Sequence, residues 1–160
     1  ILPYLEMRIL ETERYRHWKR FCYYVQIKVK RIILGDILVS GLFSLWAACQ
    51  TDLFSGIAAA SPSVWFPGFI DYMKEYKIKS KNVYLSLGNK EEKNSKSCYW
   101  QKVGDCIREG HEWNKAEGVN CTFEWNQGGH FKEPMTRTAR AFAWVMQQNR
   151  NESRVEKDHL

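Results

Sequence analysis

From residue 31 onward, short apolar segments alternate with amphipathic ones, and this alternation limits the fold more than any other feature of the sequence. The short segments end at turn-forming residues, as strands do, and are RIILG at 31–35, FSGIAAAS at 54–61, NVYLSLG at 82–88 and VNCTFEW at 119–125. The intervening segments have helical spacing, over 40–50, 68–77, 99–117 and from Pro134 onward. Strands joined by helices form parallel sheets. The sequence therefore predicts an α/β fold, a mostly parallel sheet of four to five strands with flanking helices.

A fifth strand could run from Val25 to Lys30, where apolar and polar residues alternate, and pair beside the strand at 31–35. Without it, that strand is an exposed edge with an apolar row, through which two copies of the chain could associate. The last helix is predicted to bury an apolar face made of Ala139, Phe142, Ala143 and Met146. We expect one domain over residues 1–148 and a polar tail over 149–160 that frays.

Composition indicates a packed globular protein of the cytoplasm. Apolar residues make up 44% of the chain, and no apolar run reaches the ~18 residues that span a membrane. The N-terminus lacks the layout of a signal peptide. The five cysteines are odd in number and irregularly spaced, which is typical of buried thiols in a reducing compartment. They show no zinc-ligand spacing, so no metal or other cofactor is expected.

The net charge of +6 is concentrated near the N-terminus. The segment from Arg14 to Arg31 holds seven lysines and arginines, no acid, and several aromatic rings. Cations beside rings can bind a phosphate backbone and stack bases. The same pattern also fits the solvated face of a helix followed by a strand, and we favour this second interpretation over nucleic-acid binding.

Candidate catalytic residues follow three of the predicted strands. In a parallel sheet, ligands and catalytic groups gather at the carboxyl ends of the strands. The turn LGDILVSG at 34–41 leads from a strand into a helix, as the turn that holds the nucleophile of a serine hydrolase does. Glu91 and Glu92 follow the strand that ends at Gly88, and His130 follows the last strand. The chain order is therefore turn, acid, histidine.

With these residues the sequence resembles a known family. The matching segments are GLFSLWAA at 41–48, SPSVWF at 61–66, VYLSLGNKEEK at 83–93, VGDCIREG at 103–110, FEWNQGGHF at 123–131 and AFAW at 141–144. In order and spacing they are similar to the C-terminal half of the α/β-hydrolases that include siderophore esterases. The resemblance covers most of residues 32–148. It implies a partial α/β-hydrolase fold and Ser–His–acid chemistry on acyl esters.

Carried over by this resemblance, His130 in GGHF is the catalytic histidine and Glu91 is the acid that orients it. Family members often have aspartate where Asn89 stands, which would mark a weakened acid site, and Glu91 is preferred to Asn89. The family's oxyanion hole takes one amide from a loop of the N-terminal half. This sequence shows no match to that half, so we expect it to lack that amide.

The nucleophile is the position at which this sequence departs from the family. Alignment on Gly35 places Ile37 at the serine position, and alignment on GLF places Leu38 there, so neither frame supplies a hydroxyl. Ser40 is the only serine nearby and thus the candidate nucleophile, although a serine in the first turn of a helix is most often an N-cap. Cys49 lies two turns into the helix and is expected in the core.

The sequence thus predicts a serine-esterase-like hydrolase of small-molecule esters that is impaired or inactive. Two alternatives remain open. One is a non-catalytic interaction module that uses the aromatic residues Trp65, Phe66 and Trp125. The other is a polyanion binder that uses the segment from Arg14 to Arg31.

Overall fold

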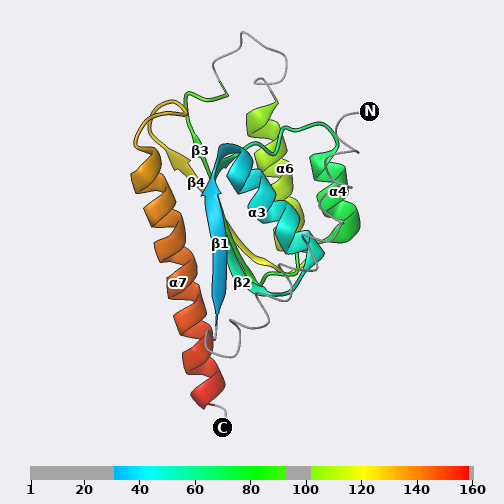
Figure 1. The fold of residues 1–160 in the computed structure, drawn as a ribbon, viewed down its shortest axis with the longest axis vertical. Coiled ribbons are helices and arrows are strands. Elements are labelled where there is room, and N and C mark those ends of the chain that lie inside the picture. Colours follow the sequence, from blue (N-terminus) through cyan, green and yellow to red (C-terminus); the bar gives the residue numbers. More distant parts are fainter. Residues whose placement is uncertain (1–30, 93–101, 159–160) are drawn as a thin grey trace, which may run out of the picture. The chain divides into compact units, whose positions relative to one another are not determined.

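The computed structural model describes residues 31–92 and 102–158 (Figure 1). The chain divides into residues 1–32 and residues 33–160, and the architecture below is that of the described residues of the second unit together with Ile32, the first residue of β1. Its elements are β1 (Ile32–Ile37), α3 (Leu38–Gln50), β2 (Phe54–Pro62), α4 (Phe69–Tyr76), β3 (Asn82–Gly88), α6 (Val103–Ala116), β4 (Asn120–Asn126) and α7 (Pro134–Asp158). The predicted strand at 25–30 and most of the basic segment lie outside the described residues.

The described strands form a four-stranded parallel sheet in the order β1-β2-β3-β4, which confirms the predicted fold class. In the register between β2 and β3, Ala58 lies opposite Tyr84. Between β3 and β4, Gly88 lies opposite Asn126, so these two strands end at the same level. The loops that follow Gly88 and Asn126 therefore start side by side.

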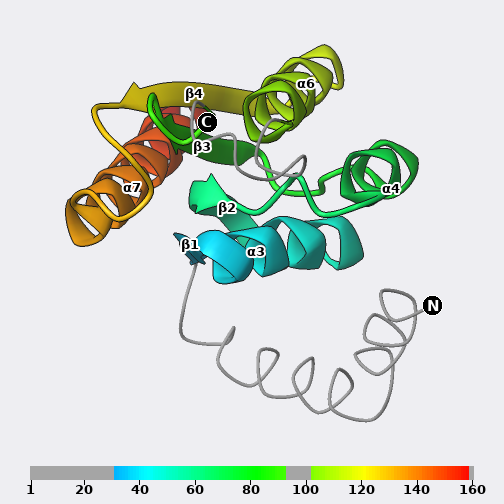
Figure 2. The same ribbon diagram turned by 90° about the horizontal axis from the view of Figure 1, so that it is seen from above.

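Helices cover both faces of the sheet. In Figure 2, α7 lies on one side of the strands, and α3, α4 and α6 lie on the other. On the α7 side, Ala58 and Tyr84 of the sheet pack against Ala141 and Val145 of the helix, and all four are buried. Because successive side chains in a strand point to opposite faces, the buried Ile57 points to the other three helices.

The buried face of α7 differs from the one that the sequence predicted. Of the predicted residues, Phe142 is half-buried and packs against the core, whereas Ala139, Ala143 and Met146 are exposed, and Ala141 and Val145 make the buried contact. Two polar residues, Arg137 and Asn149, are also buried on this helix. A rule that ranks residues by hydrophobicity assigns such polar positions to solvent, so the predicted buried face was only partly correct.

The segment expected to be a polar tail is helical, and α7 continues to Asp158. Hydrogen bonds of the buried Asn149 attach this part of the helix to the sheet. The Nδ2 of Asn82 in β3 donates to Oδ1 of Asn149 at 3.0 Å and to Oε1 of Glu152 at 2.9 Å. Asn149 in turn donates to the hydroxyl of Ser55 in β2 at 2.9 Å. These bonds tie the late turns of α7 to the amino ends of two strands.

The remaining differences are small. β1 continues two residues beyond Gly35, and α3 begins at Leu38 rather than Ser40. The buried residues of α4 are Phe69, Ile70 and Met73, as predicted. In the described part of the chain, no helix has both the length and the apolar character needed to cross a bilayer.

Gly35 lies where β1 packs closely against β2, and this contact can be tested by substitution. A Cβ added there would lie 2.2 Å from the carbonyl oxygen of Ala58, a main-chain atom that cannot move aside. We expect Gly35→Ala to lower the free energy of unfolding by about 1–3 kcal/mol in urea titrations. Gly129→Ala is the control, because a Cβ there meets no atom within 4 Å. Equal unfolding midpoints for the two variants would contradict this packing.

Candidate active site

The turn between β1 and α3 is a tight strand-to-helix turn that contains one strained residue. Leu38 follows the strand directly and has a φ of 62°, in the left-handed region that leucine rarely adopts. Its carbonyl accepts a hydrogen bond from the amide of Ser63 at 3.0 Å, which holds the turn against the end of β2. Such a conformation costs of order 1–3 kcal/mol and persists only where its surroundings impose it.

This geometry bears on the two sequence alignments of the expected nucleophile position. Ile37 has a φ of −108° and a ψ of 159°, which is ordinary extended backbone, so Leu38 occupies the apex. Gly41 allows α3 to pack closely against the ends of β1 and β2, because a Cβ there would lie 3.0 Å from the carbonyl oxygen of Asp36 and 3.2 Å from Pro62 Cβ. Ser40 is exposed in the first turn of α3, and its carbonyl accepts a bond from the Ser44 hydroxyl at 2.8 Å. The N-cap position belongs to Ile37.

The predicted acid and histidine are in contact. Glu91 lies in a tight turn after β3, where its amide donates to the carbonyl of Gly88 at 2.9 Å. His130 lies in the loop after β4, which starts beside that turn. The Nδ1 atom of His130 is 2.6 Å from Oε2 of Glu91. The side chain of His130 is 11% exposed and that of Glu91 is 1% exposed, so the pair is nearly shielded from water.

The second carboxylate oxygen of Glu91 accepts three further hydrogen bonds. Its donors are the amide of Gly88 at 2.7 Å, the hydroxyl of Ser61 at 2.8 Å and the Nη1 of Arg137 at 3.0 Å. They come from the ends of β3 and β2 and from α7 (Figure 1). A buried carboxylate is tolerated when its lone pairs are satisfied in this way.

These contacts set the ionisation of Glu91. Burial by itself raises the pKa of this carboxyl, but hydrogen bonds from His130, Ser61 and the Gly88 amide outweigh it and hold the pKa below its ordinary value. Glu91 is therefore an anion at neutral pH. An anionic carboxylate at Nδ1 favours the tautomer in which Nδ1 carries the proton, and the other ring nitrogen is then the base.

Sequence reasoning missed two residues of this cluster, Ser61 and Arg137. Ser61 is the next-to-last residue of β2, has a φ of 42° and is buried, and its hydroxyl donates to Glu91. The segment SPSVWF was part of the family resemblance, but it did not assign a role to Ser61. No pattern around Arg137 distinguished it from the other arginines of α7.

The neighbouring loop residues have structural roles. Asn89 accepts a bond from the amide of Gly128 at 2.9 Å and donates to Gln127 at 3.1 Å, so it joins the two loops. Glu92 pairs with Arg108 at 3.1 Å. Trp65 and Phe66 are half-buried after β2, and Trp125 is 42% exposed, with the guanidinium of Arg108 5.7 Å from its ring centre. The interaction-module hypothesis stays a prediction.

The described cysteines belong to the scaffold. Burial raises the pKa of Cys49 to about 12 and that of Cys121 to about 12. Burial also raises the pKa of Cys106. A thiol with so high a pKa has almost no thiolate at neutral pH and is a poor nucleophile.

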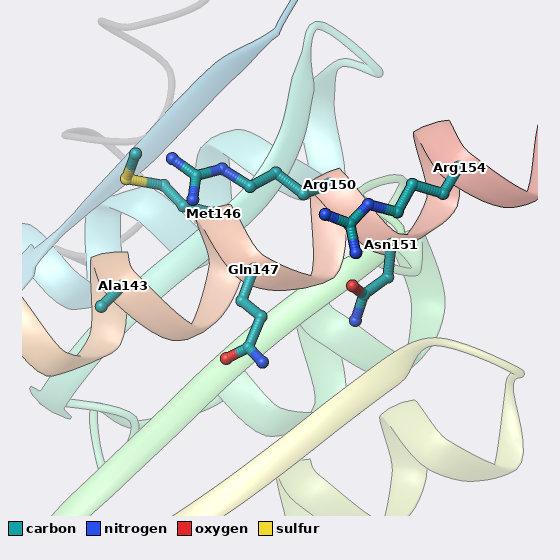
Figure 3. A pocket seen from close by; sticks show the side chains of 6 residues that line it. All are labelled: Ala143, Met146, Gln147, Arg150, Asn151 and Arg154. Carbon is teal, nitrogen blue, oxygen red and sulfur yellow. The ribbon is translucent and has the colours of Figure 1, made fainter.

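A cavity of about 510 Å³ lies along α7 (Figure 3). It is lined by Ala143, Met146, Gln147, Arg150, Asn151 and Arg154. Ala143, the lining residue nearest the start of α7, lies about 14 Å along the helix from Pro134, at 1.5 Å per residue, so the cavity is away from the histidine loop. It includes none of the predicted catalytic residues, and a cavity of this size alone assigns no chemistry to it.

Glu91 should make stability depend on acid. The folded-state pKa of Glu91 lies below the ordinary value of 4.5. The contribution of Glu91 to the free energy of unfolding is therefore complete above pH 4.5 and is lost as the pH falls through the folded-state pKa. We expect Glu91→Gln to lower the free energy of unfolding by about 3 kcal/mol near pH 7, since Arg137 is left buried without its counter-ion. The deficit should shrink as the pH falls below about 4.5, in urea titrations of both proteins.

The control is Glu92→Gln, at the next and more exposed carboxylate. Its ion pair with Arg108 is partly solvated, so we expect less than about 1 kcal/mol at any pH. A Glu91→Gln deficit that stayed constant with pH would show that the charge of Glu91 contributes nothing.

Comparison with known proteins bears on the fold. No protein-family model matches the chain, and no curated protein matches its sequence. Among solved structures, the siderophore hydrolase EstA from Aspergillus nidulans is similar, with a TM-score of 0.56 and 19% sequence identity. The match covers 74% of this chain and 49% of that enzyme, so this chain spans about half the length of the enzyme. The described residues thus have the α/β fold of a hydrolase, as the sequence resemblance implied.

Proposed function

We propose that this chain carries part of a serine-esterase-type site for small-molecule acyl esters, in which the acid–histidine pair is assembled and the nucleophile position is occupied by Leu38. The observation that carries the proposal is the contact of 2.6 Å between Glu91 and His130, at the same end of the sheet as the strained turn. We interpret them as two parts of one catalytic arrangement whose third part, the nucleophile, is missing.

The pair can perform the proton transfer that such chemistry requires. In a serine esterase the histidine takes the proton of the attacking hydroxyl and returns it to the leaving group, while the acid holds the ring. Glu91 is held by four donors and His130 by Glu91. Little reorganisation is therefore needed for His130 to act as a general base.

Leu38 removes the covalent step. A leucine side chain has no atom that can attack an ester carbonyl, and loss of the nucleophile from a dissected serine triad costs about 10⁶-fold in rate. We therefore propose that ester hydrolysis by this chain is impaired. We also propose that the amide of Val39, the residue after the apex, supplies one donor of an oxyanion hole.

Ser40 is the second candidate for the nucleophile. It lies two residues after the apex and is exposed, so a probe in solvent can reach its hydroxyl. Its place in the regular first turn of α3 gives it none of the strained geometry that presents an elbow serine to substrate. We rank it below a serine placed at residue 38.

A fluorophosphonate probe, which reacts with activated serines, tests the proposal when the adduct is located by peptide mass spectrometry. We expect no adduct on the wild-type protein and an adduct on residue 38 of Leu38→Ser. We expect His130→Ala in that background to slow the labelling by about 10²-fold or more, because the general base is lost. Val39→Ser is the matched control, since it places a serine one residue past the apex, where φ is not left-handed.

Two outcomes would change the proposal. A His130-dependent adduct on Ser40 of the wild-type protein would mean that the site is active with another nucleophile. A folded Leu38→Ser protein that labels no faster than Val39→Ser would mean that the pair and the turn do not form an esterase site.

A further inference from the structure

Arg137 is a buried cation whose contacts extend beyond an ordinary ion pair. Its side chain is 3% exposed, and it lies in the first turn of α7. One terminal nitrogen, Nη1, donates to Oε1 of Glu91 at 3.0 Å and to the hydroxyl of Ser61 at 3.3 Å. The other, Nη2, donates to the carbonyl of Gly129 at 2.9 Å and to that of Gln127 at 3.5 Å.

The bonds from Nη1 bear on which way the Glu91 carboxylate faces. Oε1 accepts from Arg137, Ser61 and the amide of Gly88, which together occupy the directions available to one carboxylate oxygen. The carboxylate cannot rotate without breaking these bonds. Oε2 is thereby left to face Nδ1 of His130.

The bonds from Nη2 bear on the position of the histidine. Gln127 and Gly129 belong to the short loop between β4 and α7, and Gly129 directly precedes His130. Gly128 between them has a φ of 103°, so the loop turns sharply there. A carbonyl on each side of this turn points to the same guanidinium nitrogen.

Because a guanidinium is planar and rigid, its two nitrogens keep a fixed separation. The nitrogen on Glu91 and the nitrogen on the His130 loop therefore set the distance between acid and loop. A lysine has a single charged nitrogen on a flexible stem and cannot impose this geometry.

We propose that Arg137 is a positioning residue, which fixes the Glu91 carboxylate and the loop of His130 relative to each other so that Nδ1 of His130 meets Oε2 of Glu91. The catalytic importance of this role rests on the esterase-type function proposed above, whereas the positioning of Glu91 and His130 does not depend on that function.

The test is the proton NMR signal of the His130 Nδ1 proton, assigned by its absence in His130→Ala. In the wild-type protein we expect a downfield signal that exchanges slowly with solvent. In Arg137→Met we expect the signal to be lost, or to exchange at least about 10-fold faster, because the ring and the carboxylate are no longer held together. Arg140→Met is the matched control, one turn further along α7, where the exposed arginine binds Glu124 and Asn126. It should leave the signal unchanged.

A purely stabilising ion pair predicts a different result. Arg137→Met would then unfold at lower urea concentration while the folded protein kept the signal and its exchange rate, and this result would overturn the proposal. Should Arg137→Met fail to fold, Arg137→Lys retains the charge beside Glu91 and serves as the second variant. We expect it to fold and still to lose the slow exchange, and a wild-type exchange rate in Arg137→Lys would equally overturn the proposal.

Labelling by the fluorophosphonate probe in the Leu38→Ser background separates this proposal from the function it rests on. We expect Arg137→Met to slow labelling by about 10-fold to 100-fold and Arg140→Met to leave it unchanged. An unlabelled Leu38→Ser protein whose His130 signal depends on Arg137 would refute the esterase-type site and retain the positioning role. If Arg137→Met instead left both the rapid labelling and the His130 signal unchanged, the esterase-type site would stand and the positioning role would be refuted.

Discussion

A carboxylate that is almost fully buried stays charged only when its surroundings replace the water it has lost, and at Glu91 this requirement organises the carboxyl end of the sheet. Four donors reach it from separate parts of the chain: Ser61, Gly88, His130 and Arg137. Each bond fixes the loop or helix end that supplies the donor. Gly88 must be a glycine here, because a Cβ would lie 2.5 Å from the Gly128 carbonyl and 2.6 Å from Oε1 of Glu91.

The turn at Leu38 keeps a strained backbone conformation at a residue with an apolar side chain. Its left-handed φ is imposed by the strand before it, the helix after it and the bond from Ser63, none of which depends on the side chain at residue 38. Strain of this kind is usually associated with function, and here it is present at a residue that cannot attack. The backbone conformation of this turn and the side chain that it carries are therefore determined by different parts of the sequence.

The sequence predicted the fold and the acid–histidine pair but not the details that hold them. β3 was predicted residue for residue, because its seven positions are all buried and bounded by polar turns. The order of the loops predicted that their side chains would meet, and the family resemblance singled out Glu91 and His130, which are in contact. The apex of the elbow could not be chosen, because the φ of Leu38 depends on contacts with β2. Ser61 and Arg137 were missed because a polar residue gives no sequence signal that it is buried.

The two polar anchors of α7 have a consequence for how the domain opens. Arg137 holds the first turn to the carboxyl ends of the strands, and Asn149 holds a later turn to the amino ends of β2 and β3. The anchors are about 18 Å apart along the helix. A helix joined to both ends of the same strands cannot separate from them one turn at a time. We therefore expect the helix between the two anchors to separate from the strands as one unit when the histidine loop unfolds.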